Sequence, residues 1–319
     1  MTLRAFRWSK ATPWLRSLSS PLLRGVSAHQ IDLLLLGMVF VWGANFVVLK
    51  VTFRTLSPLA FNALRFLLAT ALLAALMRWQ GQSLRVARAD WGRVALLGIV
   101  GHGVYQVFFV EGLARTTTAN ASLLMATVPI LVALLSAVSG SERIALERWL
   151  GIFLSFAGIL IVIVGGGRQV QFHPSHLLGD LLIMGAAVTW ALYTVMSKPL
   201  LQRYTPLRLT ATSMIPGTAA LVLFSLPALW SQPWATVAPA AWAGLGYSAI
   251  FSIALAYLIW FTGVQRVGNA RTAIYSNVTP VIASLLAWAF LGEPFGLPQI
   301  VGGAVIFAGL MLARRHGQA

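Results

Sequence analysis

The sequence predicts an all-α integral membrane protein whose ten transmembrane helices form two inverted five-helix repeats. Ten apolar stretches, each long enough to cross a bilayer, fill the chain, and the first five resemble the last five at fixed spacing. With 58% hydrophobic residues, 9% charged residues and a mean hydropathy of +0.81, the chain has too little polar surface for a soluble globule. These observations together predict a duplicated membrane protein.

Polar breaks between the apolar stretches place the ten predicted spans. About 20 helical residues cover the ~30 Å hydrocarbon core of a bilayer. The spans are 33–51, 58–77, 94–113, 119–138 and 149–164 in the first half, and 177–197, 207–229, 241–264, 270–291 and 298–313 in the second. We assign residues 1–31 to a basic cytoplasmic leader, 32–165 to the first repeat, 166–176 to a linker, 177–313 to the second repeat and 314–319 to a cytoplasmic tail.

The internal repeat is visible as identical residues at two fixed offsets. An offset of 148 pairs Gly37 with Gly185, Trp42 with Trp190 and Lys50 with Lys198. An offset of 151 pairs Pro129 with Pro280, Glu142 with Glu293, Gly151 with Gly302 and Gly158 with Gly309. Because each half holds an odd number of spans, the second copy enters the membrane in the opposite direction to the first.

Proline and glycine positions predict local features of the spans. Ser57-Pro58 and Thr205-Pro206 suit helix starts, with a hydroxyl at the N-cap and proline in the first turn. Pro129 and Pro280 lie mid-span, where proline removes a backbone hydrogen bond, so we expect a bend or a local opening there. Two roles for this bend remain open: either it serves helix packing alone, or it places backbone groups in contact with a substrate. The glycines at seven-residue spacing in the fifth and tenth spans predict close helix packing, and they are Gly151, Gly158, Gly302 and Gly309.

Basic residues in the short loops predict the orientation of the chain. With both termini in the cytoplasm, 18 of the 23 Lys and Arg residues fall inside and four outside, and Arg65 lies within a span. This bias predicts a multi-pass protein of the cytoplasmic membrane. The net charge of +16 therefore reflects topology, and we expect no nucleic-acid partner. We interpret the leader as a basic segment lying on anionic lipid, although an organelle transit peptide has a similar composition.

The motifs resemble those of the EamA-type transporters of the drug/metabolite transporter superfamily. The resemblance extends over residues 33–313 and rests on G-x4-WG-x-N-F at 37–46, SP-x4-ALRF at 57–66 and P-x-IAS-LLAW-x-FLGE at 280–293. It implies an inverted-repeat bundle in the cytoplasmic membrane that exports small metabolites such as amino acids. The repeat is asymmetric at Arg65 and Asn45, whose counterparts are Ser213 and Tyr193.

Polar residues predicted to lie at membrane depth are the candidate substrate-binding residues, because burying them in hydrocarbon is costly. Arg65 either holds a carboxylate or phosphate of the substrate, or serves structure by snorkelling outward or pairing with Glu111. His102 and Glu111 are candidates for proton coupling, and the alternative for His102 is a neutral ring bonded to a hydroxyl. The substrate-binding set is Trp42, Asn45, Arg65, His102, Gln106, Trp190, Tyr193, Tyr257, Tyr275 and Asn277, with Trp260 as a lesser candidate.

Four residues of this set form two helix faces, one in each half, that occupy equivalent positions in the repeat. Trp42 and Asn45 are three residues apart on one helix face, and Trp190 and Tyr193 hold the same positions in the second half. We expect the two faces to meet at the pseudo-symmetry axis and to line a cavity with aromatic rings and amides. The alternative is helix packing, with each indole N–H bonded to a neighbour.

Motifs of soluble enzymes are missing from the sequence. It has no G-x4-GK-[ST] loop, HExxH or GxSxG, and no cysteine. We therefore expect neither an enzyme nor a protein with a cofactor or a metal, and His173 and His176 alone do not make a metal site.

The predicted function is secondary transport of a small polar metabolite by alternating access. Export is the expected direction, the partners are the small molecule and the lipid bilayer, and the chain is a monomer or a homodimer. The alternatives are a passive facilitator or channel, or an importer of a vitamin, nucleobase or other small metabolite. A membrane enzyme or scaffold is the remaining class, for which seven scattered acidic residues give little support.

Overall fold

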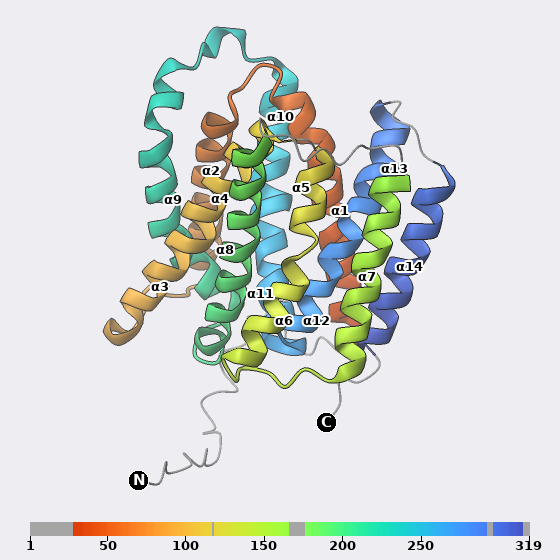
Figure 1. Cartoon of the computed structure of the whole chain (residues 1–319). Helices are drawn as coiled ribbons and strands as arrows, with labels where there is room; N and C mark the ends of the chain where they lie inside the picture. Colours follow the sequence, from red (N-terminus) through yellow and green to blue (C-terminus); the bar gives the residue numbers. More distant parts are fainter. Residues whose placement is uncertain (1–27, 117, 166–175, 292–295, 315–319) are drawn as a thin grey trace.

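The computed structural model describes residues 28–116, 118–165, 176–291 and 296–314, and all regular elements in these ranges are helices (Figure 1). The parts of the predicted leader, linker and tail at 1–27, 166–175 and 315–319 lie outside the described residues, as does Glu293. Eight helices are long and apolar enough to cross a membrane, and Leu123–Val138 and Leu297–Ala313 are shorter apolar helices. Together these ten segments match the predicted all-α membrane fold.

The helices of the two halves follow the same order. The first half consists of α1 (Ala28–Thr52), α2 (Pro58–Trp79), η3 (Arg88–Asp90), α3 (Trp91–Gly98), η4 (Ile99–Val104), α4 (Tyr105–Arg115), α5 (Thr118–Met125), α6 (Val128–Val138) and α7 (Leu146–Gly165). The second consists of α8 (Leu177–Leu201), α9 (Pro206–Ser231), η6 (Trp234–Thr236), α10 (Pro239–Tyr247), η7 (Ser248–Leu255), α11 (Ala256–Val267), α12 (Asn269–Ile274), η8 (Tyr275–Val278), α13 (Thr279–Leu291) and α14 (Leu297–Arg314).

Corresponding helices of the two halves run in opposite directions. Helix α1 begins at the lower end of the bundle as drawn in Figure 1, whereas α8 begins at the upper end. We use lower end for the end where α1 begins and α14 ends, and upper end for the end where α1 ends and α8 begins. Helix α1 starts at Ala28, before the predicted span, and buried Asp32 in its first turns pairs with Arg271 of α12.

The third and fourth spans of each half depart from regular α-helix at equivalent places. The third spans contain the π-helical segments η4 and η7. The fourth spans break just before Pro129 and Pro280, as predicted. Between α5 and α6, the N–H groups of Ala126 and Thr127 bond to carbonyls three residues back, at 3.2 and 3.1 Å, and in the second half the break is the 3₁₀ segment η8. Proline at the start of the following helix cannot donate the next bond.

The predicted glycine contacts join α7 to α14. A Cβ built on Gly158 would lie 2.7 Å from the carbonyl oxygen of Gly302, and one built on Gly151 would lie 2.5 Å from that of Gly309. The two backbones are therefore closer than any larger side chain allows, which confirms that these glycines serve helix packing.

The two predicted helix starts differ in how they are capped. The hydroxyl of Thr205 accepts a hydrogen bond from the N–H of Arg208 at 3.2 Å, as expected for an N-cap. The Ser57 hydroxyl makes no cap bond, so this part of the prediction was wrong. Its backbone N–H instead donates to the side chain of Gln232 from the end of α9, at 2.9 Å, which joins the two halves at the upper end.

A tyrosine and an ion pair hold the connection between α8 and α9 at the lower end. Buried Asp90 accepts from Arg203 at 2.6 Å and from the Tyr204 hydroxyl at 2.7 Å. Burial, reinforced by the hydrogen bond to Asp90, raises the pKa of Tyr204 above its usual value. The phenol therefore remains a protonated donor to this carboxylate.

Candidate substrate cavity

A cavity of about 440 Å³ runs from the middle of the bundle to its upper end. Its deepest wall is aromatic, and exposed Arg54 lies at its mouth beside Phe53 and Leu113. Both halves contribute, including the two broken spans. The residues that line it include Trp42, Asn45, Phe46, Arg54, Arg65, Tyr105, Gln106, Trp190, Ser252, Tyr257, Asn277, Thr279 and Ala283.

Arg65 is the charged side chain in the cavity wall at membrane depth. It is 3% exposed, and its guanidinium donates to Asn62 Oδ1 at 2.7 Å and to Gln106 Oε1 at 3.1 Å. Its Cζ lies 5.1 Å from the ring centroid of Phe61. Among the described residues no carboxylate pairs with it. The suggested pair with Glu111 is wrong, because Glu111 lies one turn from Arg115 on α4 and pairs with that residue instead.

Neutral hydrogen bonds hold the guanidinium in place, so its charge is not cancelled by a protein acid. The residues that line the cavity include Arg54 and Arg65 and, among those described, neither Asp nor Glu. A positive group in a low-dielectric wall attracts an anion strongly, and the guanidinium fork matches a carboxylate or phosphate. The cavity therefore suits a small molecule that carries such a group.

The predicted meeting of the two repeat faces occurs at the cavity floor. The rings of Trp42 and Trp190 lie edge to face with centroids 5.8 Å apart, and Trp260 packs against both, at 5.6 and 5.2 Å. The indole N–H of Trp42 donates to the Ser252 carbonyl of η7 at 3.0 Å. The floor is thus both a helix contact and an aromatic surface open to the cavity.

Amide side chains line the cavity on its α1 and η8 sides. Asn45 accepts a hydrogen bond from Ser248 of η7. Asn277 of η8 is 1% exposed, and neither its amide nitrogen nor its amide oxygen has a partner among the described residues. A buried amide without partners is costly, so this position suits a polar group that arrives with the cargo or with water.

His102, Tyr193 and Tyr275 of the substrate-binding set lie outside the cavity wall, as do the lesser candidate Trp260 and the proton-coupling candidate Glu111. His102 is fully buried, and its Nε2 is 3.3 Å from Ser213 Oγ and 3.2 Å from the Tyr193 hydroxyl. Tyr193, the counterpart of Asn45, is thereby turned away from the cavity. Tyr275 donates to Asp32 at 2.5 Å near the lower end.

A short hydrogen-bond chain connects these groups across the halves. Gln106 accepts from Arg65 and donates to the Tyr257 hydroxyl at 2.9 Å, and the Tyr257 ring stacks on that of His102 with centroids 5.4 Å apart. Arg65 and its counterpart Ser213 therefore contact residues one turn apart in the same span, Gln106 and His102.

Several lining residues were not among the sequence candidates. Phe46 lies in the wall on α1, one residue after Asn45, whereas Ser252 lies in η7 and Thr279 follows the break between α12 and α13. The repeated prolines were the available signal for Thr279. No local pattern marks Ser252, because a π-helical segment has no sequence signature that a single chain reveals.

An inverted pair of five-helix units around a cavity at membrane depth is the architecture of a multi-pass membrane transporter. The sequence profile of the EamA-like transporter family matches residues 29–164 and 177–315. The chain belongs to this family, as the resemblance of its motifs implied.

Similar proteins agree with this assignment. An uncharacterized transporter of Bacillus subtilis, YyaM, is 30% identical over 284 residues, which cover 89% of this chain and 93% of that protein. A probable terminal-alkyne amino-acid exporter of Streptantibioticus cattleyicolor is 30% identical over 278 residues, 87% of this chain and 91% of that protein. A solved crystal structure superposes with a TM-score of 0.79 at 22% identity and covers 91% of this chain and 98% of that one, which supports the fold.

Proposed function

We propose that this chain is a secondary transporter of the cytoplasmic membrane that exports small carboxylate-bearing metabolites, such as amino acids, by alternating access. The observation that carries the proposal is Arg65. Its guanidinium lies in the wall of the cavity, held by neutral partners, without an acidic residue among the described lining. The similarity to a probable amino-acid exporter supports the same class of cargo.

The rest of the cavity suits the remainder of such a molecule. Aromatic rings from α1, α4, α8 and α11 offer stacking and apolar contact, and Asn45, Asn277 and Thr279 offer hydrogen bonds. Carboxylate contact at Arg65 fixes one end of the cargo. Affinity for the other end then depends on how well it fills the aromatic part of the cavity.

Efflux from proteoliposomes tests the proposal. Vesicles containing the purified protein are preloaded with labelled amino acids, and efflux is followed with and without an imposed pH gradient. We expect saturable efflux of at least one carboxylate-bearing compound. Arg65→Gln should lower its apparent affinity by about 10- to 100-fold, since a charge-assisted hydrogen bond is worth ~1.5–3 kcal/mol. Arg78→Gln, an exposed arginine in the last turn of the same helix, is the matched control.

Failure of any candidate compound to move, beside a working control transporter, would count against the proposal. Counterflow separates a carrier from a channel, because only a site that faces one side at a time lets an opposing gradient of unlabelled cargo drive the accumulation of label. A dependence of efflux on the pH gradient that is lost in His102→Gln or Glu111→Gln would assign proton coupling to that residue.

A further inference from the structure

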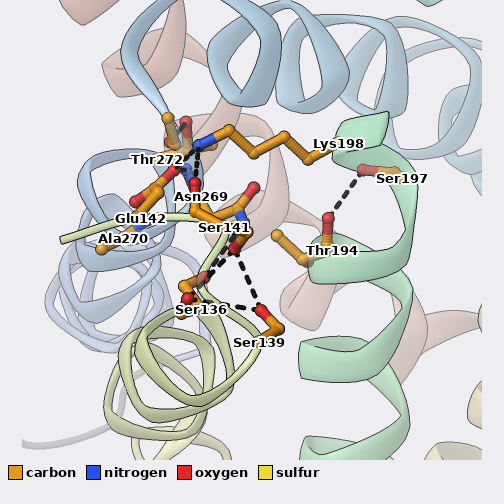
Figure 2. A network of polar contacts seen from close by, with 11 residues as sticks. Ser136, Ser139, Ser141, Glu142, Thr194, Ser197, Lys198, Asn269, Ala270 and Thr272 are labelled. Carbon is orange, nitrogen blue, oxygen red and sulfur yellow. Dashed lines mark hydrogen bonds and ion pairs between the residues drawn. The ribbon is translucent and has the colours of Figure 1, made fainter. Parts of the chain in front are cut away.

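The lower end of the bundle is closed by a polar cluster between the two halves. Glu142, in the connection between α6 and α7, is 9% exposed and accepts from Lys198 of α8 at 2.5 Å. It also accepts from the backbone N–H groups of Asn269 and Ala270, at 2.5 and 3.3 Å. Figure 2 shows Lys198 reaching from α8 toward Glu142 and Asn269. One carboxylate thus joins three separate elements.

Further bonds complete the cluster, which we call the latch and define as Ser136, Ser141, Glu142, Lys198 and Asn269. Lys198 also donates to the Ser141 carbonyl at 3.1 Å, and the Asn269 side chain donates to Ser136 Oγ at 3.0 Å (Figure 2). Ser136, Ser141 and Glu142 come from the first half, whereas Lys198 and Asn269 come from the second.

The backbone at Gly268 is shaped for this contact. Gly268 has a φ of +92°, a conformation that side chains other than glycine rarely adopt, and a Cβ there would lie 2.6 Å from Glu142 Oε1. The absence of a side chain lets the carboxylate reach the free N–H groups that open α12.

A continuous series of contacts leads from the cavity floor to the latch. Trp260 is fully buried beneath Trp42 and Trp190, and its indole N–H donates to Thr194 Oγ1 at 3.2 Å. The carbonyl of Thr194 in turn accepts from Ser197, the residue before Lys198, at 2.7 Å. The aromatic floor and the latch both consist of contacts between the halves, and together they close the bundle below the cavity.

The two ends of the bundle differ in how the described residues connect its elements. At the lower end, ion pairs join separate elements: Glu142 with Lys198, Asp90 with Arg203 and Asp32 with Arg271. At the upper end, where the cavity opens, Glu111 and Arg115 pair within α4, and the hydrogen bonds that cross between the halves include those of Ser57 with Gln232 and of Thr116 with Asp180. The lower end is thus the one at which three of the described ion pairs join separate elements.

We propose that the latch is a gate: it holds the lower end shut while the cavity is open at the upper end, and its bonds from Glu142 to Lys198 and Asn269 break when the protein opens the other way. The inference rests on the proposed alternating access, in which the halves must part at the lower end to release or admit cargo there. A charged latch suits a reversible gate, because the separated carboxylate and ammonium regain water. A purely apolar seam would instead expose hydrocarbon when it opened.

Single-cysteine accessibility tests the latch without knowledge of the cargo, because the chain has no native cysteine. Ser197→Cys reports on the lower end, since Ser197 is fully buried there. Ala283→Cys reports on the wall of the open cavity. Each reporter is combined with Glu142→Gln in the full-length protein in proteoliposomes. The rate of modification by a membrane-impermeant cationic methanethiosulfonate is then measured from each side.

We expect Glu142→Gln to raise modification of Ser197→Cys about tenfold or more and to lower that of Ala283→Cys, because loss of a buried ion pair shifts the population toward the opposite opening. Lys198→Met should act in the same direction. Glu147→Gln makes the same charge change five residues along the chain. Glu147 has no hydrogen bond to α8 or α12 in the described part of the chain, so this control should leave both rates unchanged.

Two results would overturn the latch. One is an unchanged rate at Ser197→Cys in both variants, with unfolding temperatures showing that the protein is folded. The other is a rise at both reporters, which would indicate general loosening and not an exchange between two openings. Because no cargo is used, a failure here differs from failure of the proposed function, in which efflux is absent even for the unsubstituted protein.

Discussion

Gln106 holds the cavity arginine in place and joins it to the second half. Its side-chain oxygen accepts from Arg65 and its amide nitrogen donates to Tyr257, while its backbone carbonyl accepts from Asn62 at 3.3 Å. An amide is the one side chain of this size that offers an acceptor to the guanidinium and a donor to the phenol without adding charge. The neutrality of Gln106 therefore leaves the positive charge of Arg65 available to a bound anion.

Gln106→Glu tests this role, because it places a carboxylate of nearly the same shape beside Arg65. We expect the apparent affinity for a carboxylate-bearing substrate to fall about tenfold or more, since the new acid competes for the guanidinium. The unfolding temperature should change little, because the hydrogen bond from Arg65 is kept and the Tyr257 hydroxyl can donate to the new carboxylate in place of accepting from the amide. Efflux kinetics measure the first quantity and a thermal melt in detergent the second. Equal affinity in the two proteins would show that Arg65 does not bind the anion.

Helix contacts in this bundle depend on positions where a methyl group has no room. In α7 and α14 the glycines face each other's backbone, so the two helices pack closely enough for weak dispersion contacts to accumulate. This matters in a membrane, because lipid is as apolar as the helix surfaces and gives no hydrophobic drive to association.

Gly158→Ala should therefore destabilise the protein by about 1–3 kcal/mol, as expected for overpacking a close contact. A thermal melt or a denaturant titration in detergent measures this cost. Gly37→Ala is the matched control, because a Cβ at Gly37 in α1 would meet nothing within 4 Å. The control should be neutral or stabilised by up to ~1 kcal/mol, since alanine favours helix. Similar shifts in both variants would contradict the packing role.

On the scale of the whole molecule, the distribution of basic residues indicates which end of the bundle faces the cytoplasm. Most of the described basic residues outside the spans lie at the lower end, among them Arg85, Arg88, Arg143 and Arg203, whereas Arg54 and Arg115 lie at the upper end. Positively charged loops stay on the cytoplasmic side of a membrane. The lower end, with its latch, is therefore the expected cytoplasmic end, and the cavity is expected to open outward.

Cysteine labelling in intact cells measures this orientation directly. Arg85→Cys lies in an exposed connection at the lower end, and Ala235→Cys lies in an exposed connection at the upper end. We expect a membrane-impermeant maleimide to label Ala235→Cys from outside and to reach Arg85→Cys only after the cells are permeabilised. Labelling of both from outside would contradict the inverted topology.

The candidate site could be predicted from the sequence in part. Repeat symmetry and depth placed Trp42, Arg65, Gln106, Trp190, Tyr257 and Asn277 among the candidates, and the structure brings these side chains to one cavity. Whether they bind substrate remains a prediction. Tyr193, His102 and Tyr275 were chosen on the same grounds but point elsewhere, because depth alone does not say which face of a helix meets the cavity.

The sequence by itself determined the class of fold, the repeat, the broken fourth spans and the tight α7–α14 contact. Each of these follows from local chemistry: hydropathy, a missing proline N–H or a missing glycine side chain. Only the tertiary structure decided that Arg65 pairs with Gln106 and not with Glu111, and that Glu142 bonds to Lys198 and Asn269. Such partners are distant along the chain, so their choice depends on how the helices pack and on which side each residue faces.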